Sequence, residues 1–177
     1  MNPTILVAGI GTIFLGDDAF GVEVARSLLK RRLPESVSVR DFGIRGFDLA
    51  YALLDPWHNV ILIDALPRGE APGTLFVMEP DLAAMGTSSS PDMAFNAHSM
   101  DPVRVLNLAS SIGSISAKIF IVGCQPHDFG DELEGRMGLS TPVEAVVEDA
   151  SNMVERLAQR LLATSTESRL RSQPVER

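Results

Sequence analysis

The N-terminal segment joins an apolar run directly to a glycine-rich turn, and this junction limits the folds that the chain can adopt. Residues 5–8 are apolar, Gly9 and Gly11 follow, and apolar residues with helical spacing begin at Ala19. A strand, a tight turn and a helix are therefore expected in this order. Apolar runs and helical segments keep alternating along the chain, which is typical of a layered α/β domain.

The turn resembles a nucleotide-binding loop, but its side chains do not suit phosphate. The dinucleotide-binding pattern requires a third glycine where this chain has Phe14, and no Lys-Ser or Lys-Thr pair follows the loop. Asp17 and Asp18 stand at the start of the expected helix, where their charges would repel an anion. The turn is better suited to a cation, a proton or a positively charged group.

The remaining elements are predicted from apolar periodicity and turn signals. Asp17 or Asp18 is expected to cap the first helix, and Thr141 and Glu144 have the spacing of a capping box for the last one. The expected strands are residues 4–8, 37–41, 60–63, 74–78 and 118–122, and the expected helices are residues 18–33, 47–54, 101–111 and 141–163.

Length, charge and composition restrict the class of protein. The 177 residues fit one domain, expected over residues 1–163, with a disordered C-terminal tail over residues 164–177. The net charge of −8 argues against a nucleic-acid partner. No apolar run is long enough to cross a membrane and no secretory signal is recognisable, so we expect a cytoplasmic protein without a membrane partner. The single cysteine, Cys124, excludes an internal disulfide and is expected to be a buried small apolar residue.

Acidic residues follow the first three expected strands. Asp17 and Asp18 come after the first, Asp41 after the second and Asp64 after the third, while His98 lies in a long irregular segment, residues 79–100. In open α/β sheets, ligands bind beyond the carboxyl ends of the strands. Asp18, Asp64 and His98 would together form a ligand set for a divalent transition metal, although the composition of the set does not select one metal.

Each candidate also has a structural interpretation. Asp17 can serve as the helix cap, which would leave Asp18 as the freer ligand, and Asp41 can serve the turn that follows it. Asp64 closes an apolar strand, where a carboxylate is costly without a partner, so a functional role is favoured. His127, after the last strand, is a reserve candidate, and His58 is expected to be a surface or packing residue.

Five segments of the chain match one known family when they are taken in order. They are Gly9-Ile10-Gly11-Thr12-Ile13-Phe14-Leu15-Gly16-Asp17-Asp18-Ala19-Phe20-Gly21-Val22, Asp41-Phe42-Gly43-Ile44-Arg45-Gly46, Ile63-Asp64-Ala65, Pro72-Gly73-Thr74 and Ala97-His98. This ordered set resembles the nickel-iron hydrogenase maturation endopeptidases over about residues 4–160.

The resemblance implies a fold, a substrate and a set of site residues. The fold would be a three-layer α/β/α arrangement with a twisted, mostly parallel sheet, of the phosphorylase/hydrolase-like type. The enzymes of this family remove a C-terminal extension from the hydrogenase large-subunit precursor once nickel has been inserted. Their metal-contacting positions fall on Asp18, Asp64 and His98, and the segment that is thought to meet the substrate falls on Asp41, Gly43 and Ile44.

The chain departs from the family pattern at two places. Thr12 stands where the family usually has Asn, which is expected to alter a hydrogen bond of the turn without changing the metal set. Residues 41–44 read Asp-Phe-Gly-Ile where the family often has Asp-Gly-Gly-Thr. Because this segment is the one expected to meet the substrate, the particular hydrogenase that is processed stays open.

Two mechanisms and two further functions remain open from the sequence. The hydrolytic water can be activated by the nickel of the precursor or by Asp18 or Asp64 as general base, the latter as in an aspartyl-type endopeptidase. A non-enzymatic nickel-binding chaperone would use the same ligands. A peptidyl-tRNA hydrolase-like enzyme is the least favoured, because neither a histidine near the first helix nor a basic face is visible.

Overall fold

A five-stranded sheet forms the centre of the molecule. The computed structural model describes residues 4–82, 101–130 and 133–171, with side chains described as far as residue 165. The strands are β1 (Ile5–Ile10), β2 (Val37–Gly43), β3 (Asn59–Ala65), β4 (Leu75–Met78) and β5 (Lys118–Cys124), in the spatial order β2-β1-β3-β5-β4. All neighbouring strands are parallel except β4, which runs antiparallel to β5.

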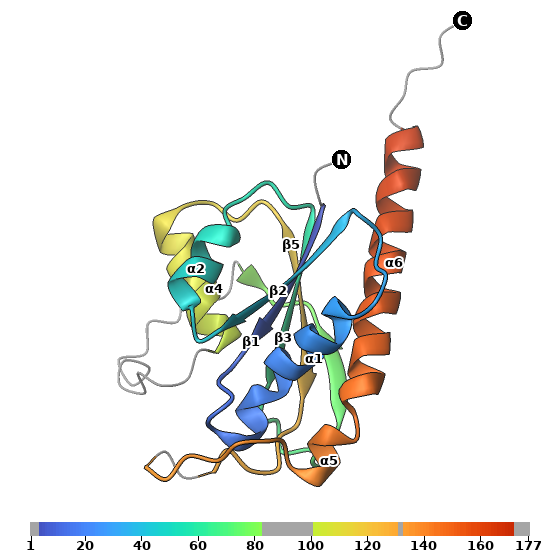
Figure 1. Cartoon of the computed structure of the whole chain (residues 1–177). Coiled ribbons are helices and arrows are strands. Elements are labelled where there is room, and N and C mark those ends of the chain that lie inside the picture. Colours follow the sequence, from blue (N-terminus) through green and yellow to red (C-terminus); the bar gives the residue numbers. More distant parts are fainter. Residues whose placement is uncertain (1–3, 83–100, 131–132, 172–177) are drawn as a thin grey trace, which may run out of the picture.

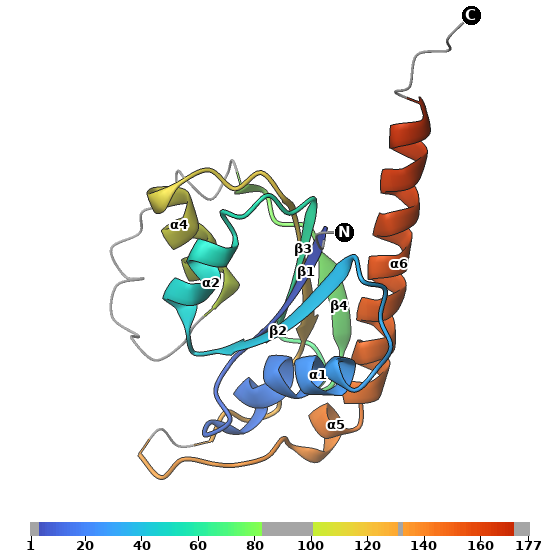
Figure 2. The ribbon, with the colours of Figure 1, turned by 45° about the horizontal axis from the view of Figure 1, so that its top comes forward.

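Helices cover both faces of the sheet and make three layers (Figures 1 and 2). One face carries α1 (Phe20–Leu29) and α6 (Val147–Arg171), and the other carries α2 (Gly46–Ala52) and α4 (Pro102–Ile112). A short 3₁₀ turn, Gly16–Ala19, precedes α1, and the four-residue α5 (Thr141–Glu144) precedes α6. Among the described helices, none is both long and apolar enough to cross a membrane.

The apolar runs are continuous because the central strands are buried on both faces. In β1, Leu6, Ala8 and Ile10 pack in the layer of α2 and α4. Ile5 and Val7 pack in the layer of α1 and α6. These five side chains are fully buried, so each successive residue of β1 contributes to a core.

The contact between α1 and the sheet requires glycine. A Cβ added at Gly21 would lie 2.1 Å from the carbonyl oxygen of Ile63 and 2.3 Å from that of Ile10. Gly9 is equally close to the helix, since its added Cβ would lie 2.3 Å from the carbonyl oxygen of Gly21. The two glycines therefore let α1 approach β1 and β3 and fix the position of the turn between them.

The predicted α/β class and mostly parallel sheet are confirmed, but several helix ends differ. No side chain caps α1, whose N-cap is Ala19, so the expectation that Asp17 or Asp18 caps it is wrong. The expected capping box is also wrong, because Thr141 is the first residue of α5 and its N-cap, Ser140, makes no side-chain capping bond. The first helix ends at Leu29, and α6 continues to Arg171, into the segment expected to be disordered. Residues 172–177 lie outside the described part.

Replacement of Gly21 by alanine tests the close approach of α1. We expect Gly21→Ala to lower the free energy of unfolding by about 3 kcal/mol, because the added methyl would overlap two backbone carbonyls. Urea unfolding measures the change. Gly69→Ala is the control, since Gly69 has a positive φ but open space around its Cβ position, and it should cost about 1 kcal/mol. Equal losses in the two variants would contradict the packing explanation.

Candidate functional site

The turn after β1 places the carboxylate of Asp18 against its own backbone. The Thr12 amide donates a 2.7 Å hydrogen bond to Asp18 Oδ2, and the Thr12 hydroxyl accepts from the Phe14 amide at 3.3 Å. Gly11 has a φ of 124°, and a Cβ there would lie 1.8 Å from the carbonyl oxygen of Asp18. Asp18 is half-buried, and this burial raises the pKa of its carboxyl group, an effect that the Thr12 amide partly opposes.

Asp64 lies near the carboxyl end of β3 and is almost fully buried. Its Oδ1 accepts a 2.8 Å hydrogen bond from the Ala65 amide. Burial raises the pKa of Asp64 well above its usual value, the negative charges of Asp18 and Asp101 raise it further, and the Ala65 amide lowers it. Asp18 and Asp64, predicted from the strand ends, therefore lie close enough for the charge of Asp18 to raise the pKa of Asp64.

Asp101 is an acidic neighbour of this pair, and it lies at the start of the helix that was expected over residues 101–111. It does cap α4, since its Oδ1 accepts from the Val103 amide at 2.7 Å and from the Arg104 amide at 3.1 Å. Its charge also raises the pKa of Asp64. The cap of α4 could be recognised from the sequence Asp101-Pro102. The proximity of Asp101 to Asp64, in contrast, depends on how α4 packs.

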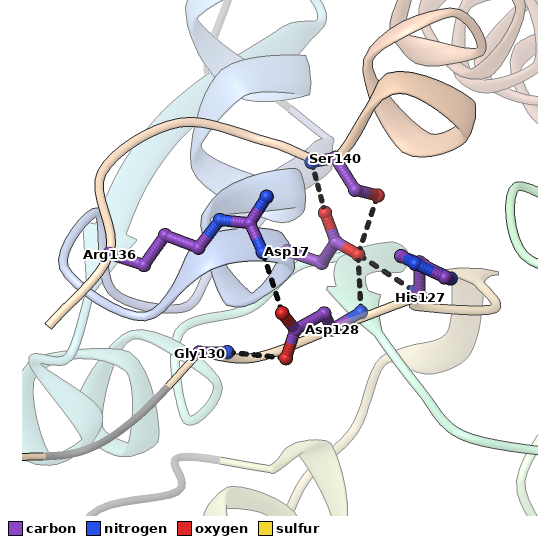
Figure 3. A network of polar contacts seen from close by, with 6 residues as sticks. All are labelled: Asp17, His127, Asp128, Gly130, Arg136 and Ser140. Atoms are coloured by element: carbon purple, nitrogen blue, oxygen red, sulfur yellow. Dashed lines mark hydrogen bonds and ion pairs between the residues drawn. The ribbon is translucent and has the colours of Figure 1, made fainter.

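Asp17 forms a separate, structural network, which Figure 3 shows in close-up. Its side chain is fully buried and accepts four hydrogen bonds. The amides of His127 and Asp128 donate to Oδ2 at 2.7 and 2.9 Å, the Ser140 hydroxyl donates to Oδ2 at 2.8 Å, and the Ser140 amide donates to Oδ1 at 2.6 Å. Burial alone would raise the pKa of Asp17, but these donors together lower it.

Backbone hydrogen bonds also connect the first turn with the segment that precedes α5. The Gly16 amide donates to the Arg136 carbonyl at 2.8 Å, and the Arg136 amide donates to the Phe14 carbonyl at 2.7 Å. The Arg136 guanidinium and the Asp128 carboxylate form an exposed ion pair at 2.6 Å (Figure 3). The turn that carries Asp18 is therefore attached to the segment after β5 and to the start of α5. Asp17 makes this attachment, and a role as helix cap is excluded.

The segment after β2 lies beside the first turn. The Gly11 amide donates to the Gly43 carbonyl at 3.1 Å, and the side chain of Ile44 is 63% exposed. Asp41 is half-buried, and its carboxylate lies 3.6 Å from the Arg26 guanidinium on α1. The carboxylate of Asp41 therefore forms an ion pair with α1. It also lies close to the turn after β2 that it was expected to serve.

The remaining candidates lie in different environments. His98 falls outside the described residues. His127 has an exposed side chain, and its backbone amide donates to Asp17. His58 is exposed, as expected for a surface residue. Cys124 is buried, and burial first, then the charge of Asp17, raise the pKa of its thiol to about 12, which makes it a poor nucleophile.

The described part of the site therefore offers two carboxyl groups for metal binding or proton transfer. Within residues 4–82, 101–130 and 133–171, no group of three or more His, Cys, Asp and Glu side chains is arranged to hold a metal ion. Asp18 and Asp64 offer oxygen ligands, and burial raises the pKa of both carboxyl groups above its usual value. A predicted third ligand, His98, would have to come from outside the described part.

Comparisons with known proteins agree on one family. The family HycI, described as hydrogenase maturation protease, matches residues 22–157. The hydrogenase 2 maturation protease of Escherichia coli strain K12 is 30% identical over 152 residues, which cover 85% of this chain and 87% of that protein. The hydrogenase expression/formation protein HupD of Rhizobium leguminosarum bv. viciae is 31% identical over 157 residues, covering 88% and 74%.

Solved structures agree with the sequence comparisons. The hydrogenase maturating endopeptidase HybD from E. coli superimposes with a TM-score of 0.70 at 29% identity, over 90% of this chain and 93% of that one. The hydrogenase 2 maturation peptidase from Thaumarchaeota archaeon SCGC_AB-539-E09 gives a TM-score of 0.65, also at 29% identity, over 88% and 97%. The predicted family and its fold are confirmed.

The Asp17 network predicts a large effect on stability. Asp17→Ala removes the acceptor of four hydrogen bonds and leaves buried donors without a partner, so we expect the free energy of unfolding to fall by about 3 kcal/mol or more. Arg136→Ala removes only the exposed ion pair of the same network and should cost less than about 1 kcal/mol. Denaturant unfolding of both variants measures the two changes in the free energy of unfolding. Similar losses would show that the buried carboxylate of Asp17 is not the main attachment of the turn.

The raised pKa of Asp64 predicts a pH-dependent stabilisation by Asp64→Asn. A carboxyl group whose pKa is higher in the folded than in the unfolded state, where it is about 3.9, weakens the fold increasingly as the pH rises above that lower value. Asparagine keeps the acceptor for the Ala65 amide but has no charge. The variant should therefore have little advantage in melting temperature at pH 4 and a clear one at pH 7. An advantage that shrinks as the pH rises would contradict this electrostatic account.

Proposed function

The chain belongs to the hydrogenase maturation protease family and is therefore a peptidase, and from this premise we propose that it removes the C-terminal extension of a nickel-iron hydrogenase large-subunit precursor. Cleavage would follow nickel insertion, so that it reports a completed metal centre. The single observation that carries the proposal is the pair Asp18 and Asp64 at the carboxyl end of the sheet, where the charge of Asp18 raises the pKa of the buried Asp64.

The charge of this pair supports recognition of a cation. Within the described residues, no ion pair joins Asp18 or Asp64 to a Lys, Arg or His side chain. A buried carboxyl group without a cationic partner destabilises the fold, and a bound cation would relieve that cost. We assign this role to the nickel of the precursor, which belongs to the substrate.

His98 completes the proposed nickel-recognition set with Asp18 and Asp64. The set follows from the family resemblance and from the position of both acids at one sheet edge. Asp101 supports it further, because it follows His98 by three residues in the sequence and its charge raises the pKa of Asp64. One imidazole and two carboxylates suit a borderline divalent metal such as nickel.

The proposed contact with the polypeptide part of the precursor lies next to these acids. We assign it to Asp41, Gly43 and Ile44, and the hydrogen bond between the Gly11 amide and the Gly43 carbonyl supports this assignment because it holds the segment beside the first turn. Ile44 is largely exposed and can contact an apolar side chain of the precursor, whereas the half-buried Asp41 can accept hydrogen bonds from its backbone. The precursor would then span the turn that carries Asp18.

Asp64 is the proposed general base for the hydrolytic water, as in an aspartyl-type peptidase, with Asp18 as the second carboxyl group of the pair. A general base works best when its pKa lies near the working pH, and burial and the charge of Asp18 both raise the pKa of Asp64 in that direction. The nickel of the precursor would orient the peptide for attack. The cytoplasmic location expected from the sequence forms part of the same proposal.

Purified protein, incubated with a nickel-loaded and with a nickel-free large-subunit precursor, tests the proposed function. Cleavage of the loaded precursor only is the expected result, with loss of a short C-terminal peptide measured by mass spectrometry. Asp64→Asn should lower the cleavage rate by about a thousandfold or more, since it removes the general base. Asp55→Asn is the matched control, because Asp55 is exposed and precedes β3, at the opposite end of that strand from Asp64.

Three outcomes would contradict the proposal. Equal cleavage of the loaded and nickel-free precursors would exclude nickel sensing. Wild-type cleavage by Asp64→Asn would remove Asp64 from the mechanism. Nickel or precursor binding without any cleavage by the wild-type protein would favour a chaperone role.

A further inference from the structure

Arg68 is an exposed cation in the loop that follows β3, four residues after Asp64. Its guanidinium carbon lies 4.6 Å from the centre of the Phe76 ring on β4, a distance that allows a cation–π contact. Among the described residues, no carboxylate forms an ion pair with Arg68, although Glu70 lies in the same loop. The hydrogen-bond donors of the guanidinium therefore remain available to a ligand.

The sheet register places Phe76 on the same face of the sheet as Asp64. Gly123 of β5 pairs with Asp64 of β3 on one side and with Phe76 of β4 on the other. Paired residues of neighbouring strands point to the same face, and two strand spacings amount to roughly 10 Å. A Cβ added at Gly123 would lie 2.3 Å from the Phe76 ring, so the ring lies over this glycine. Arg68 therefore stacks on the face of the sheet to which Asp64 points.

Gln125 holds the loop that carries Arg68. The side chain of Gln125 is buried, and its Oε1 accepts from the Arg68 amide at 2.6 Å and from the Glu70 amide at 3.2 Å. The Gly73 amide donates to the Gln125 carbonyl at 2.8 Å, and the Gln125 amide donates to the Thr74 carbonyl at 2.9 Å. Because these bonds already fix the loop, the stacking contact is not needed to close it. A guanidinium on a fixed loop loses less entropy when it binds a ligand.

Roles within the chain do not account for Arg68. Other arginines near this end of the sheet are engaged by protein oxygens: Arg26 by Glu23 and Asp41, Arg45 by the carbonyls of Asp41 and Phe42, Arg104 by Asp101, and Arg136 by Asp128. Arg68 is not a counter-ion of the acidic pair either. The charges of described residues that shift the pKa of Asp64 are those of Asp18 and Asp101, both negative.

The guanidinium and the class of substrate together define the ligand chemistry. A guanidinium presents a planar set of donors that matches a carboxylate and can bind it through two hydrogen bonds. The substrate of a peptidase is a polypeptide, and its anionic groups are the carboxylates of acidic side chains and of the C-terminus. Since this chain has a net charge of −8, an acidic segment would be repelled from much of its surface. A fixed, unpaired arginine gives such a segment one defined position.

We propose that Arg68, stacked on Phe76, binds a carboxylate of the precursor segment that lies over Asp64. The inference rests on the proposed function, since it names a feature of the same substrate. In the order β2-β1-β3-β5-β4, Phe76 lies on β4, whereas residues 41–44 lie at the end of β2, on the other side of the acidic pair. The precursor is then held on both sides of Asp18 and Asp64.

Steady-state cleavage of nickel-loaded precursor tests the contact. Arg68→Gln removes the charge, and we expect KM to rise about tenfold while kcat changes less than twofold, because charge-assisted hydrogen bonds to the substrate are lost and the carboxyl pair is intact. Arg68→Lys keeps the charge without the planar donors and should give an intermediate KM. Urea unfolding checks that both variants are folded.

Lys118→Gln is the matched control. Lys118 also lies over an aromatic ring, 5.2 Å from the centre of the Phe120 ring, but it is the first residue of β5, at the opposite end of the sheet from Asp64. The variant removes the same charge, and its KM should stay within twofold of wild type.

Changed precursors identify the source of the carboxylate. If it is an acidic side chain near the cleaved bond, its replacement by the amide should raise the KM of the wild-type protein about tenfold and leave that of Arg68→Gln unchanged. If it is the C-terminal carboxylate, a neutral Gly-Ser segment added to the extension should have the same effect, because it moves that carboxylate away. Equal changes of KM in wild type and Arg68→Gln with every changed precursor would show that Arg68 binds no carboxylate.

The outcomes separate this contact from the proposed function. An unchanged KM in Arg68→Gln, with an active wild-type protein, would overturn the contact alone. A lower kcat with an unchanged KM would show that Arg68 only supports the arrangement of the site, and would also overturn it. Failure of the wild-type protein to cleave any precursor would overturn the proposed function and this inference with it.

Discussion

The buried carboxylate of Asp17 is the interaction on which the arrangement of the site depends. Four donors from two distant parts of the chain converge on it, the amides of His127 and Asp128 and both the amide and the hydroxyl of Ser140. A charged acceptor in a buried setting is stable only when its hydrogen bonds are made, so the three segments are fixed together. The turn that carries Asp18 and the segment before α5 are both held by this connection.

Asp17 and its neighbour Asp18 experience opposite electrostatic environments. Donors surround Asp17 and lower its pKa in spite of burial, whereas Asp18 accepts from one amide among the described residues and has a raised pKa. The pKa of Asp64 is raised most strongly, by burial and by the negative charges of Asp18 and Asp101. One carboxylate stabilises the fold, and the other two are kept at a cost to stability, which is the expected signature of groups retained for function.

Much of the fold could be predicted because its signals are local. The apolar runs of β1, β3 and β5 are continuous since these strands are covered on both faces, and the positions of Asp18 and Asp64 at strand ends followed from the same pattern. The role of Asp17 could not be predicted, because its partners lie 110 to 123 residues away in the sequence. The expected capping box failed for the same reason: the Ser140 hydroxyl donates to Asp17 instead of serving α5.

The central claim is that Asp17 has a structural role and its neighbour Asp18 a functional one. Parallel measurements on Asp17→Asn and Asp18→Asn test it most directly. For each variant, the free energy of unfolding and the rate of cleavage of nickel-loaded precursor are measured at a temperature where the protein is folded. The account predicts that Asp17→Asn loses much stability and that its cleavage rate falls far less than that of Asp18→Asn, which keeps its stability but loses cleavage. The reverse pattern would show that Asp17 is the functional acid and Asp18 the structural one.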